Sequence, residues 1–466
     1  MKIYNSQSRR KEEFVPVHEG EVRIYACGPT VYNYFHVGNA RPFIVFDVLR
    51  RYLEHRGYKV TFVQNFTDID DKMIKRANEE HITVKELGDH FIEEYFKDAK
   101  ALGIRPATVH PRATEHIGDI IKLIKTLQQK GLAYEVNGDV YYDTKAFPGY
   151  GKLSGQNLDD LEAGARIEVD DIKKNPADFA LWKAAKPGEP SWPSPWGQGR
   201  PGWHIECSAM SMKYLGETFD IHTGGKDLLF PHHENEIAQS EGATGKPYVH
   251  YWMHNGFINI DNEKMSKSAG NFFTVRDILK EFAAEDVRFF MLSAHYRSPL
   301  NFSRDMIAQA HSSLMRLYTA RDQLRFLLEH AKERDLTSEE KAFIERVHEN
   351  AAHFDEAMDD DLNTADAIGA LFSLVQDANV SLNADSAKEA VQTALDTLLS
   401  LCDVLGLLMQ KAEDTLPENV QALVDARAAA RKSKEWKRSD ELRDEIKALG
   451  YIVEDTAQGQ KVRKSV

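Results

Sequence analysis

A strand, a helix and a second strand are predicted in close succession near the start of the chain, and this pattern restricts the fold more than any other feature. "EVRIYACGP" (21–29) reads as a strand that ends in a Gly-Pro turn. "ARPFIVFDVLRRYLEHRG" (40–57) reads as a helix, and "YKVTFVQNF" (58–66) as the second strand. Because a helix between two strands makes them parallel, we expect an α/β fold with a Rossmann-type parallel sheet.

The predicted helix at 40–57 carries an apolar face. Its apolar residues at helical spacing should face a core: Val45, Val48, Leu49 and Tyr52. Pro42 falls in the expected first turn, where proline is tolerated, and Gly57 follows the expected last turn.

The remainder of the chain divides into further predicted regions. A stretch with five Pro, four Gly and three Trp (186–204) is expected to be a loop that closes an insertion, the chain from about 305 is expected to be helical, and Pro417 marks a boundary before a small unit with a terminal hairpin. The predicted domains are a split Rossmann domain at 1–110 and 200–260, a connective insertion at 111–199, a loop region at 261–305, a helical bundle at 306–405 and a C-terminal unit at 406–466.

Composition restricts where the protein is expected in the cell and which chemistry its cysteines can have. The 466 residues contain no apolar run long enough for a signal peptide or a membrane span, so we expect a cytoplasmic protein without membrane contact. Three cysteines, Cys27, Cys207 and Cys402, argue against a disulfide framework but leave metal-bound or reactive thiols open.

The net charge of −14 does not favour binding to nucleic acid, yet residues 427–447 hold eight Lys or Arg against five Asp or Glu. That segment is either an RNA contact or a solvated helix face.

Two motifs could bind a nucleotide. In "CGPTVYNYFHVGNAR" (27–41), His36, Gly38 and Asn39 are expected just before a helix N-terminus, which suits a phosphate group. "EKMSKSAGN" (263–271) places Lys264 and Lys267 in a cationic loop that could neutralise charge on a triphosphate. Taken singly, the first motif is more commonly explained by a capping or packing histidine, and the second by a solvated lysine-rich turn.

A third stretch, "FPHHENEIAQSE" (230–241), could hold a metal, act in acid/base chemistry or simply start a polar helix. With Pro231 at a first helical position, His232 and Glu236 would share one helix face. Together with Cys27 and Cys207 they make a plausible zinc shell, although a buried cysteine is more commonly a small apolar residue.

The pairing of "HVGN" after the first strand with "KMSKS" after the last resembles the two signature motifs of class I aminoacyl-tRNA synthetases. Asn39 stands where that class usually has histidine, which puts proton transfer, but not hydrogen bonding, at this position in doubt. Six longer blocks further resemble the cysteinyl-tRNA synthetase family nearly end to end: "YACGPTVY", "NFTDIDDKMIKRA", "RPGWHIECSAMS", "DIHTGGKDLLFPHHENEIAQSE", "KMSKSAGN" and "DELRDEI".

This resemblance implies a ligase that activates cysteine with ATP and Mg²⁺ and transfers it to the 3′-terminal adenosine of its tRNA. It implies the following site residues: Cys27, Cys207, His232 and Glu236 for a Zn²⁺ ion that binds the substrate thiolate; Gly28, Thr67 and Trp203 for cysteine; His36, Gly38, Asn39, Gly225, Asp227 and Lys267 for ATP; and Arg431, Trp436 and Asp440 for the anticodon. His36, Asn39, Lys264 and Lys267 would act in catalysis, and the 406–466 unit would bind the anticodon.

Zinc would give a selectivity that an apolar pocket lacks. Cysteine and serine are nearly isosteric, and an apolar pocket separates such pairs by only about 1–3 kcal/mol. A zinc ion prefers soft sulfur over a hydroxyl oxygen. One alternative is a related cysteine ligase acting on an amino-sugar in thiol biosynthesis, which would lack the full anticodon unit. Another is a non-catalytic zinc-stabilised RNA-binding protein, which would be expected to lose "HVGN" or "KMSKS". We expect a monomer.

Overall fold

The computed structural model of the chain describes residues 1–157, 173–260, 263–264, 273–409, 418–456 and 459–464. It contains two compact units, which are described separately. The first comprises Met1–Met315, Ala351–Leu371 and Leu401–Leu407, and the second comprises Arg316–Asn350, Phe372–Ser400 and Leu408–Val466. The domain boundaries expected from the sequence stay predictions.

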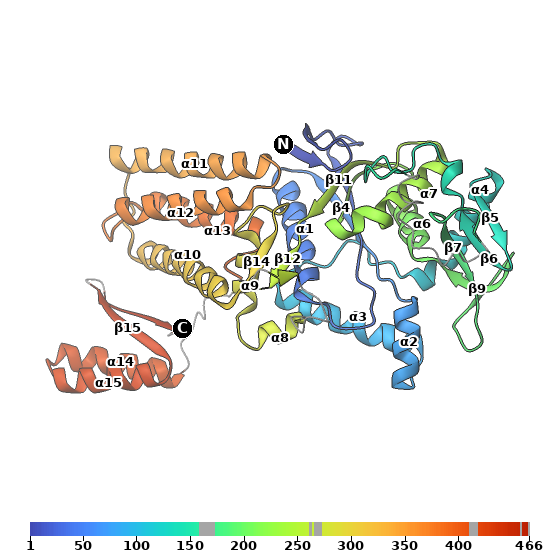
Figure 1. Cartoon of the computed structure of the whole chain (residues 1–466). Coiled ribbons are helices and arrows are strands. Elements are labelled where there is room, and N and C mark those ends of the chain that lie inside the picture. Colours follow the sequence, from blue (N-terminus) through green and yellow to red (C-terminus); the bar gives the residue numbers. More distant parts are fainter. Residues whose placement is uncertain (158–172, 261–262, 265–272, 410–417, 457–458, 465–466) are drawn as a thin grey trace. The chain divides into compact units, whose positions relative to one another are not determined.

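The first unit is built on a four-stranded parallel sheet, of which β4 and β11 are labelled in Figure 1. Its order is β11 (Val249–Asn255), β10 (Phe219–Gly225), β3 (Glu21–Ala26) and β4 (Lys59–Gln64). Helix α1 (Val37–His55) connects β3 to β4. All four apolar residues of its predicted core face are at most 2% exposed. The strand, helix and strand pattern thus forms as expected.

Helix α1 begins three residues earlier than the sequence suggested. His36 is its N-terminal flanking residue, so Gly38 and Asn39 lie in the first turn of the helix. The prediction that these two residues precede the helix was wrong. Pro42 consequently falls inside the helix and not in its first turn. The earlier start is set by backbone pairing outside the helix, because Val37 N–H donates to Phe273 O at 3.1 Å and Val275 N–H donates to Phe35 O at 3.1 Å.

The carboxyl ends of the parallel strands meet at one edge of the sheet. Cys27 directly follows β3, Asn65 follows β4, and Gly225 and Asn255 end β10 and β11. In open parallel sheets this edge is where ligands bind. The cysteine that the sequence singled out therefore stands at the position where a site is expected.

The insertion forms an antiparallel five-stranded sheet. Its order is β5 (Ala133–Val136), β6 (Asp139–Tyr142), β7 (Phe179–Ala184), β9 (Gly197–Pro201) and β8 (Trp192–Ser194). Helix α4 (Ile117–Gln129) packs on it through a shared apolar core. The prediction of a loop over 186–204 was wrong, since β8, β9 and the start of α6 lie within it. Pro193 is accommodated because β8 is an edge strand, and Gly197, with φ +104°, makes the turn.

Helices α6 (Trp203–Leu215) and α7 (Glu234–Thr244) pack side by side, and α6 also contacts β3, β4 and β7 (Figure 1). The other elements within or beginning in the first unit are β1 (Lys2–Asn5), β2 (Arg10–Glu13), α2 (Asp71–Glu80), α3 (Val84–Ala101), β12 (Ile258–Ile260), β13 (Glu263–Lys264), α8 (Val275–Leu279), α9 (Ala284–Leu292), β14 (Leu300–Phe302) and α10 (Arg304–His330).

From Arg304 to Leu405 the chain is mainly helical, as predicted, with α11 (Ser338–Asp359), α12 (Thr364–Ser381) and α13 (Lys388–Leu405) following α10. The C-terminal part of the second unit contains α14 (Glu418–Lys432), α15 (Trp436–Ala448) and the expected hairpin of β15 (Tyr451–Thr456) and β16 (Gly459–Lys464). Val420, Val424 and Ile446 form the centre of its small core. Among the described residues, no helix is both long and apolar enough to cross a membrane.

Candidate metal centre and substrate pocket

The four residues proposed as metal ligands lie together at the carboxyl edge of the sheet. Cys27 Sγ is 3.8 Å from Cys207 Sγ and 3.7 Å from Glu236 Oε1, and His232 Nε2 is 3.1 Å from the same Glu236 oxygen. One donor atom from each of the four residues lies within 4.8 Å of the others. These separations suit the edges of a tetrahedron of ligands around a zinc-sized ion, with bonds of about 2.0–2.3 Å.

The local path of the chain at this site differs from the one predicted. Helix α7 begins at Glu234, and Pro231 lies in a separate helical turn over Leu229–His233, where Phe230 has extended backbone angles. His232 and Glu236 nevertheless meet. The Glu234 carboxylate, which is fully buried, accepts backbone hydrogen bonds from Gly151, Leu153 and Ser154 and so ties the insertion to the start of α7.

Neighbouring side chains orient the ligand atoms. His222 Nε2 donates to Glu236 Oε2 at 2.8 Å and the Tyr248 hydroxyl donates to the same oxygen at 3.0 Å, which leaves Oε1 facing Cys27 and His232. His232 Nδ1 pairs with His204 Nδ1 at 2.9 Å, so His232 Nε2 is the nitrogen turned toward the cluster. Such outer partners fix the orientation of metal ligands.

The charges of the cluster are those of a cation site. A hydrogen bond from Cys27 lowers the pKa of Cys207 to about 6, while burial raises the pKa of Cys27 well above its usual value. Burial alone would raise the pKa of Glu236, but His222 and His232 outweigh it and hold it at about 2. Burial would likewise lower the pKa of His232, yet Cys207 and Glu236 raise it to about 10.

These shifts favour a thiolate at Cys207 and a carboxylate at Glu236, and negative charge on both residues attracts a cation. Two thiols, an imidazole and a carboxylate are also the donor types that zinc prefers. The residues present thus fit a bound metal ion.

A second group of four donors overlaps the first. It consists of Cys27, His222, His233 and Glu236, again with one donor atom each within 4.8 Å. His233 Nε2 is 3.4 Å from Cys27 Sγ. No sequence pattern indicated a role for His222.

The residues expected to contact cysteine border this cluster. The Gly28 amide donates to Asn65 Oδ1 at 2.9 Å, and the Thr67 hydroxyl donates to Glu206 Oε2 at 3.0 Å. Trp203 packs its ring 4.4 Å from that of His232 while remaining 42% exposed. A cleft of about 390 Å³ opens beside Trp203, and its walls include Asp70, Asp178, Lys183 and Arg200.

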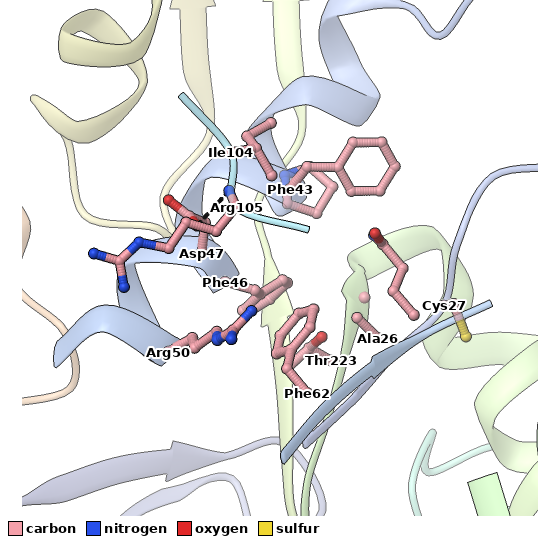
Figure 2. Close-up of a pocket in the computed structure, with 13 residues that line it drawn as sticks. Ala26, Cys27, Phe43, Phe46, Asp47, Arg50, Phe62, Ile104, Arg105 and Thr223 are labelled. Atoms are coloured by element: carbon pink, nitrogen blue, oxygen red, sulfur yellow. Dashed lines mark hydrogen bonds between the residues drawn. The ribbon is translucent and has the colours of Figure 1, made fainter. Parts of the chain in front are cut away.

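A cavity lined mainly by α1, β3 and β4 is too small to hold a substrate. Figure 2 shows Phe43, Phe46 and Phe62 around it, with the Cys27 sulfur turned away from these rings. Its volume of about 20 Å³ holds no more than about one water molecule. The thiol of Cys27 is thus directed toward the metal cluster.

The residues expected to bind ATP fall near the same edge of the sheet. His36, Gly38 and Asn39 are half-buried at the start of α1, Gly225 ends β10, and Asp227 is exposed in the following turn. Lys264 belongs to β13, which pairs with β12, whereas Lys267 and Ser268 lie outside the described residues.

The three residues expected to contact the anticodon lie in the C-terminal helices of the second unit. Trp436 begins α15 and is 56% exposed, and the Arg431 guanidinium lies 5.8 Å from its ring centroid. Asp440 pairs with Arg443 at 3.3 Å one turn further along α15. Trp436 thus offers a ring face to solvent beside a cation.

Six residues with evident roles around the cluster were missed: Asn65, His204, Glu206, His222, Tyr248 and His254. Five of them are fully or almost fully buried polar groups, and His204 is partly so. Asn65 and Glu206 stand inside sequence blocks that were noticed, but their partners come from other elements. Only the fold shows that they meet.

The chain matches known protein families over most of its length. The family model described as the class I (C) tRNA synthetase catalytic domain matches residues 13–312, the DALR domain matches 353–410, and the cysteinyl-tRNA ligase anticodon-binding domain matches 413–463. Curated proteins named cysteine–tRNA ligase from Clostridioides difficile strain 630 and Lachnospira eligens are each 56% identical, covering 100% and 98% of this chain and 100% and 99% of their own lengths.

Solved structures share the fold at low identity. Methionyl-tRNA synthetase of Mycobacterium tuberculosis in complex with methionyl-adenylate has a TM-score of 0.60 at 16% identity and covers 83% of this chain and 89% of its own. A putative arginyl-tRNA synthetase from Campylobacter jejuni has a TM-score of 0.57 at 12% identity and covers 85% and 94%.

The parallel sheet, the site at its carboxyl edge and the matched catalytic domain define an aminoacyl-tRNA synthetase of class I. Within that class, the chain belongs to the cysteine–tRNA ligase family. The amino-sugar ligase considered as an alternative is not favoured, because the anticodon-binding domain is present.

Proposed function

We propose that the chain activates L-cysteine with ATP to form cysteinyl-adenylate and then transfers cysteine to the 3′-terminal adenosine of the tRNA for cysteine. Cys27, Cys207, His232 and Glu236 would hold a Zn²⁺ ion, which would select the substrate. When bound, zinc supplies a soft Lewis acid that prefers the substrate's sulfur to the oxygen of serine.

The residues of the chain then orient the amino acid. Trp203 lies over His232 and closes one side of the site, and Thr67 is held in place by the buried Glu206. Gly28 keeps the backbone after β3 against Asn65. The carboxylate of cysteine is left to attack the α-phosphorus of ATP, and pyrophosphate leaves.

Residues at the start of α1 stabilise the negative charge on the phosphates. His36 and Asn39 donate hydrogen bonds there, supported by the positive potential of the helix N-terminus. Gly225 and Asp227 complete the ATP site, Mg²⁺ accompanies the nucleotide, and Lys264 and Lys267 neutralise charge that develops as pyrophosphate leaves. Positioning and electrostatics carry most of the rate.

The C-terminal unit recognises the tRNA. Trp436 stacks on an unpaired anticodon base, and Arg431 and Asp440 read base edges. The protein acts as a monomer in the cytoplasm.

The observation that carries this proposal is the meeting of Cys27, Cys207, His232 and Glu236 at the carboxyl edge of the sheet. The test is ATP–pyrophosphate exchange with cysteine and with serine, before and after zinc removal confirmed by elemental analysis. We expect activity with cysteine only, its loss on metal removal and its return with Zn²⁺.

A matched pair of variants isolates the ligand role. Cys207→Ser should lose zinc and exchange activity, whereas Cys402→Ser, which alters a buried cysteine of α13, should keep both. Equal exchange with serine, or full exchange in metal-free protein, would overturn the proposed role of zinc.

A further inference from the structure

The two groups of potential metal ligands share the two residues that are able to bridge two ions. Cys27 and Glu236 belong to both groups. The remaining donors divide between them, with Cys207 and His232 in one group and His222 and His233 in the other. A thiolate has several lone pairs and a carboxylate has two oxygens, so each shared residue can ligate one ion on either side.

The two oxygens of Glu236 are already divided in this way. Oε1 lies 3.1 Å from His232 Nε2 and 3.7 Å from Cys27 Sγ. Oε2 lies 2.8 Å from His222 Nε2. Cys27 Sγ is in turn 3.4 Å from His233 Nε2. Each oxygen therefore faces a different set of ligands.

The adjacent His232 and His233 are arranged alike. Both are fully or almost fully buried, and both turn Nε2 toward the cluster. His232 Nδ1 pairs with His204, and His233 Nδ1 pairs with His254 Nε2 at 2.8 Å. His254 Nδ1 continues to the Ser6 hydroxyl at 2.8 Å. An outer hydrogen-bond partner of this kind is what metal-bound histidines usually have.

His222 can also free its Nε2 atom. Its Nδ1 atom is buried without a hydrogen-bond partner among the described residues, so the ring can carry its proton there while Nε2 binds a cation. Because this nitrogen has no partner, no outer hydrogen bond holds the His222 ring in place as a ligand. A cation bound here should accordingly be held more weakly than one bound by Cys207 and His232.

We propose that the cluster binds a second divalent cation through Cys27, His222, His233 and Glu236, bridged to the zinc of the proposed function by the Cys27 thiolate and the Glu236 carboxylate. This inference rests on the zinc site proposed above. Two ions sharing such bridges lie about 3.5–4 Å apart. The second cation draws on ligands of the first and so inhibits cysteine activation when free zinc is in excess.

The experiment uses the full-length protein loaded with one zinc and dialysed against stepwise higher concentrations of buffered free Zn²⁺, with metal content measured by mass spectrometry. We expect a second zinc per chain, bound at least about 100-fold more weakly than the first. Cysteine-dependent pyrophosphate exchange should fall as it binds and recover when a chelator restores one zinc. His233→Gln and His222→Gln should each bind one zinc only, whereas His250→Gln, at an exposed position on β11, should bind two.

Cobalt substitution tests the bridge itself. In the dicobalt protein, coupling through the shared ligands should reduce the integrated electron paramagnetic resonance signal below twice that of the one-cobalt form. A stoichiometry that stays at one, an uncoupled dicobalt signal, or a second zinc that persists in both histidine variants would overturn this inference while leaving the proposed function intact. Failure to bind the first zinc would overturn both.

Discussion

The Gly28 amide donates to Asn65 Oδ1 at 2.9 Å, and at this point the two chain segments are so close that a Cβ at position 28 would lie 1.6 Å from the Asn65 carbonyl oxygen. Gly28 directly follows Cys27, so the contact sets where that thiol stands. The glycine is required because of backbone proximity, since no side chain can relax to make room.

Gly28→Ala should therefore displace Cys27 and lower kcat/KM for cysteine activation by about 100-fold or more, the effect of a misplacement of about 1 Å. Pyrophosphate exchange measures it. Gly118→Ala in α4 is the control, because a Cβ there meets nothing within 4 Å, and it should leave exchange unchanged. Wild-type activity in Gly28→Ala would contradict the close approach.

A buried arginine ties α1 to the segment before β12. Arg41 is fully buried, and its guanidinium donates to Gly256 O at 2.9 Å, Phe257 O at 3.2 Å and His295 O at 3.1 Å. Lysine cannot reproduce this fork of donors. Arg41→Lys should lower the free energy of unfolding by about 2 kcal/mol, as expected for losing hydrogen bonds to a charged group.

The same substitution should lower kcat of pyrophosphate exchange about 10-fold, because α1 carries His36 and Asn39 and β12 leads to Lys264; a tenfold change corresponds to about 1.4 kcal/mol of barrier. Urea unfolding and exchange kinetics measure the two effects. Arg304→Lys, with a side chain 74% exposed and paired with Glu281, serves as control and should change neither.

Features of the fold that depend on one segment could be predicted from the sequence, and features that depend on distant residues could not. The strand, helix and strand pattern was readable because Val45, Val48, Leu49 and Tyr52 recur at helical spacing, which is a property of one segment. The start of α1 was misplaced because pairing with Phe273 and Val275, far along the chain, sets it. Likewise, the strands within 186–204 exist because an insertion sheet pairs with a stretch whose composition alone favours a loop.

The candidate site shows the same division. His232 and Glu236 could be paired from their spacing, whereas Cys27 and Cys207, distant in the sequence, were only a plausible completion of the shell until the family resemblance implied them. His204, His222 and His254 have no local pattern that reveals them. Their role depends on side chains from several different elements meeting in a buried cluster, which no single segment encodes.

A buried ion pair should make stability depend on pH. Asp47 accepts hydrogen bonds from Arg288 at 2.6 Å and Arg51 at 2.8 Å, and all three residues are buried. Burial alone would raise the pKa of Asp47, but Arg288 and Arg51 outweigh it and hold the pKa below its usual value of 3.8. A lowered folded-state pKa stabilises the fold above pH 3.8, and this contribution is lost as the pH falls through the folded-state pKa.

Asp47→Asn should lower the free energy of unfolding by about 3–5 kcal/mol, because Arg288 is left as a buried charge without its carboxylate. It should also flatten the loss of stability below pH 3.8 relative to the wild type. Urea unfolding at a series of pH values measures both. Asp305→Asn, at an exposed position of α10, is the control. An unchanged pH slope in Asp47→Asn would contradict the assignment.

The exposed ring of Trp436 should contribute to RNA recognition and not to cysteine activation. It is 56% exposed beside Arg431 and belongs to a different unit from the metal cluster. Loss of one base stacked on an aromatic ring costs about 1–3 kcal/mol. Trp436→Ala should therefore raise KM for tRNA in aminoacylation by about 5- to 150-fold, leaving cysteine-dependent pyrophosphate exchange unchanged.

Trp436→Phe, which keeps a ring, should recover part of the loss, whereas Leu449→Ala, at an exposed apolar position at the end of α15, should leave both reactions as in the wild type. A parallel fall in exchange and charging would show that Trp436 acts through folding and not through the anticodon.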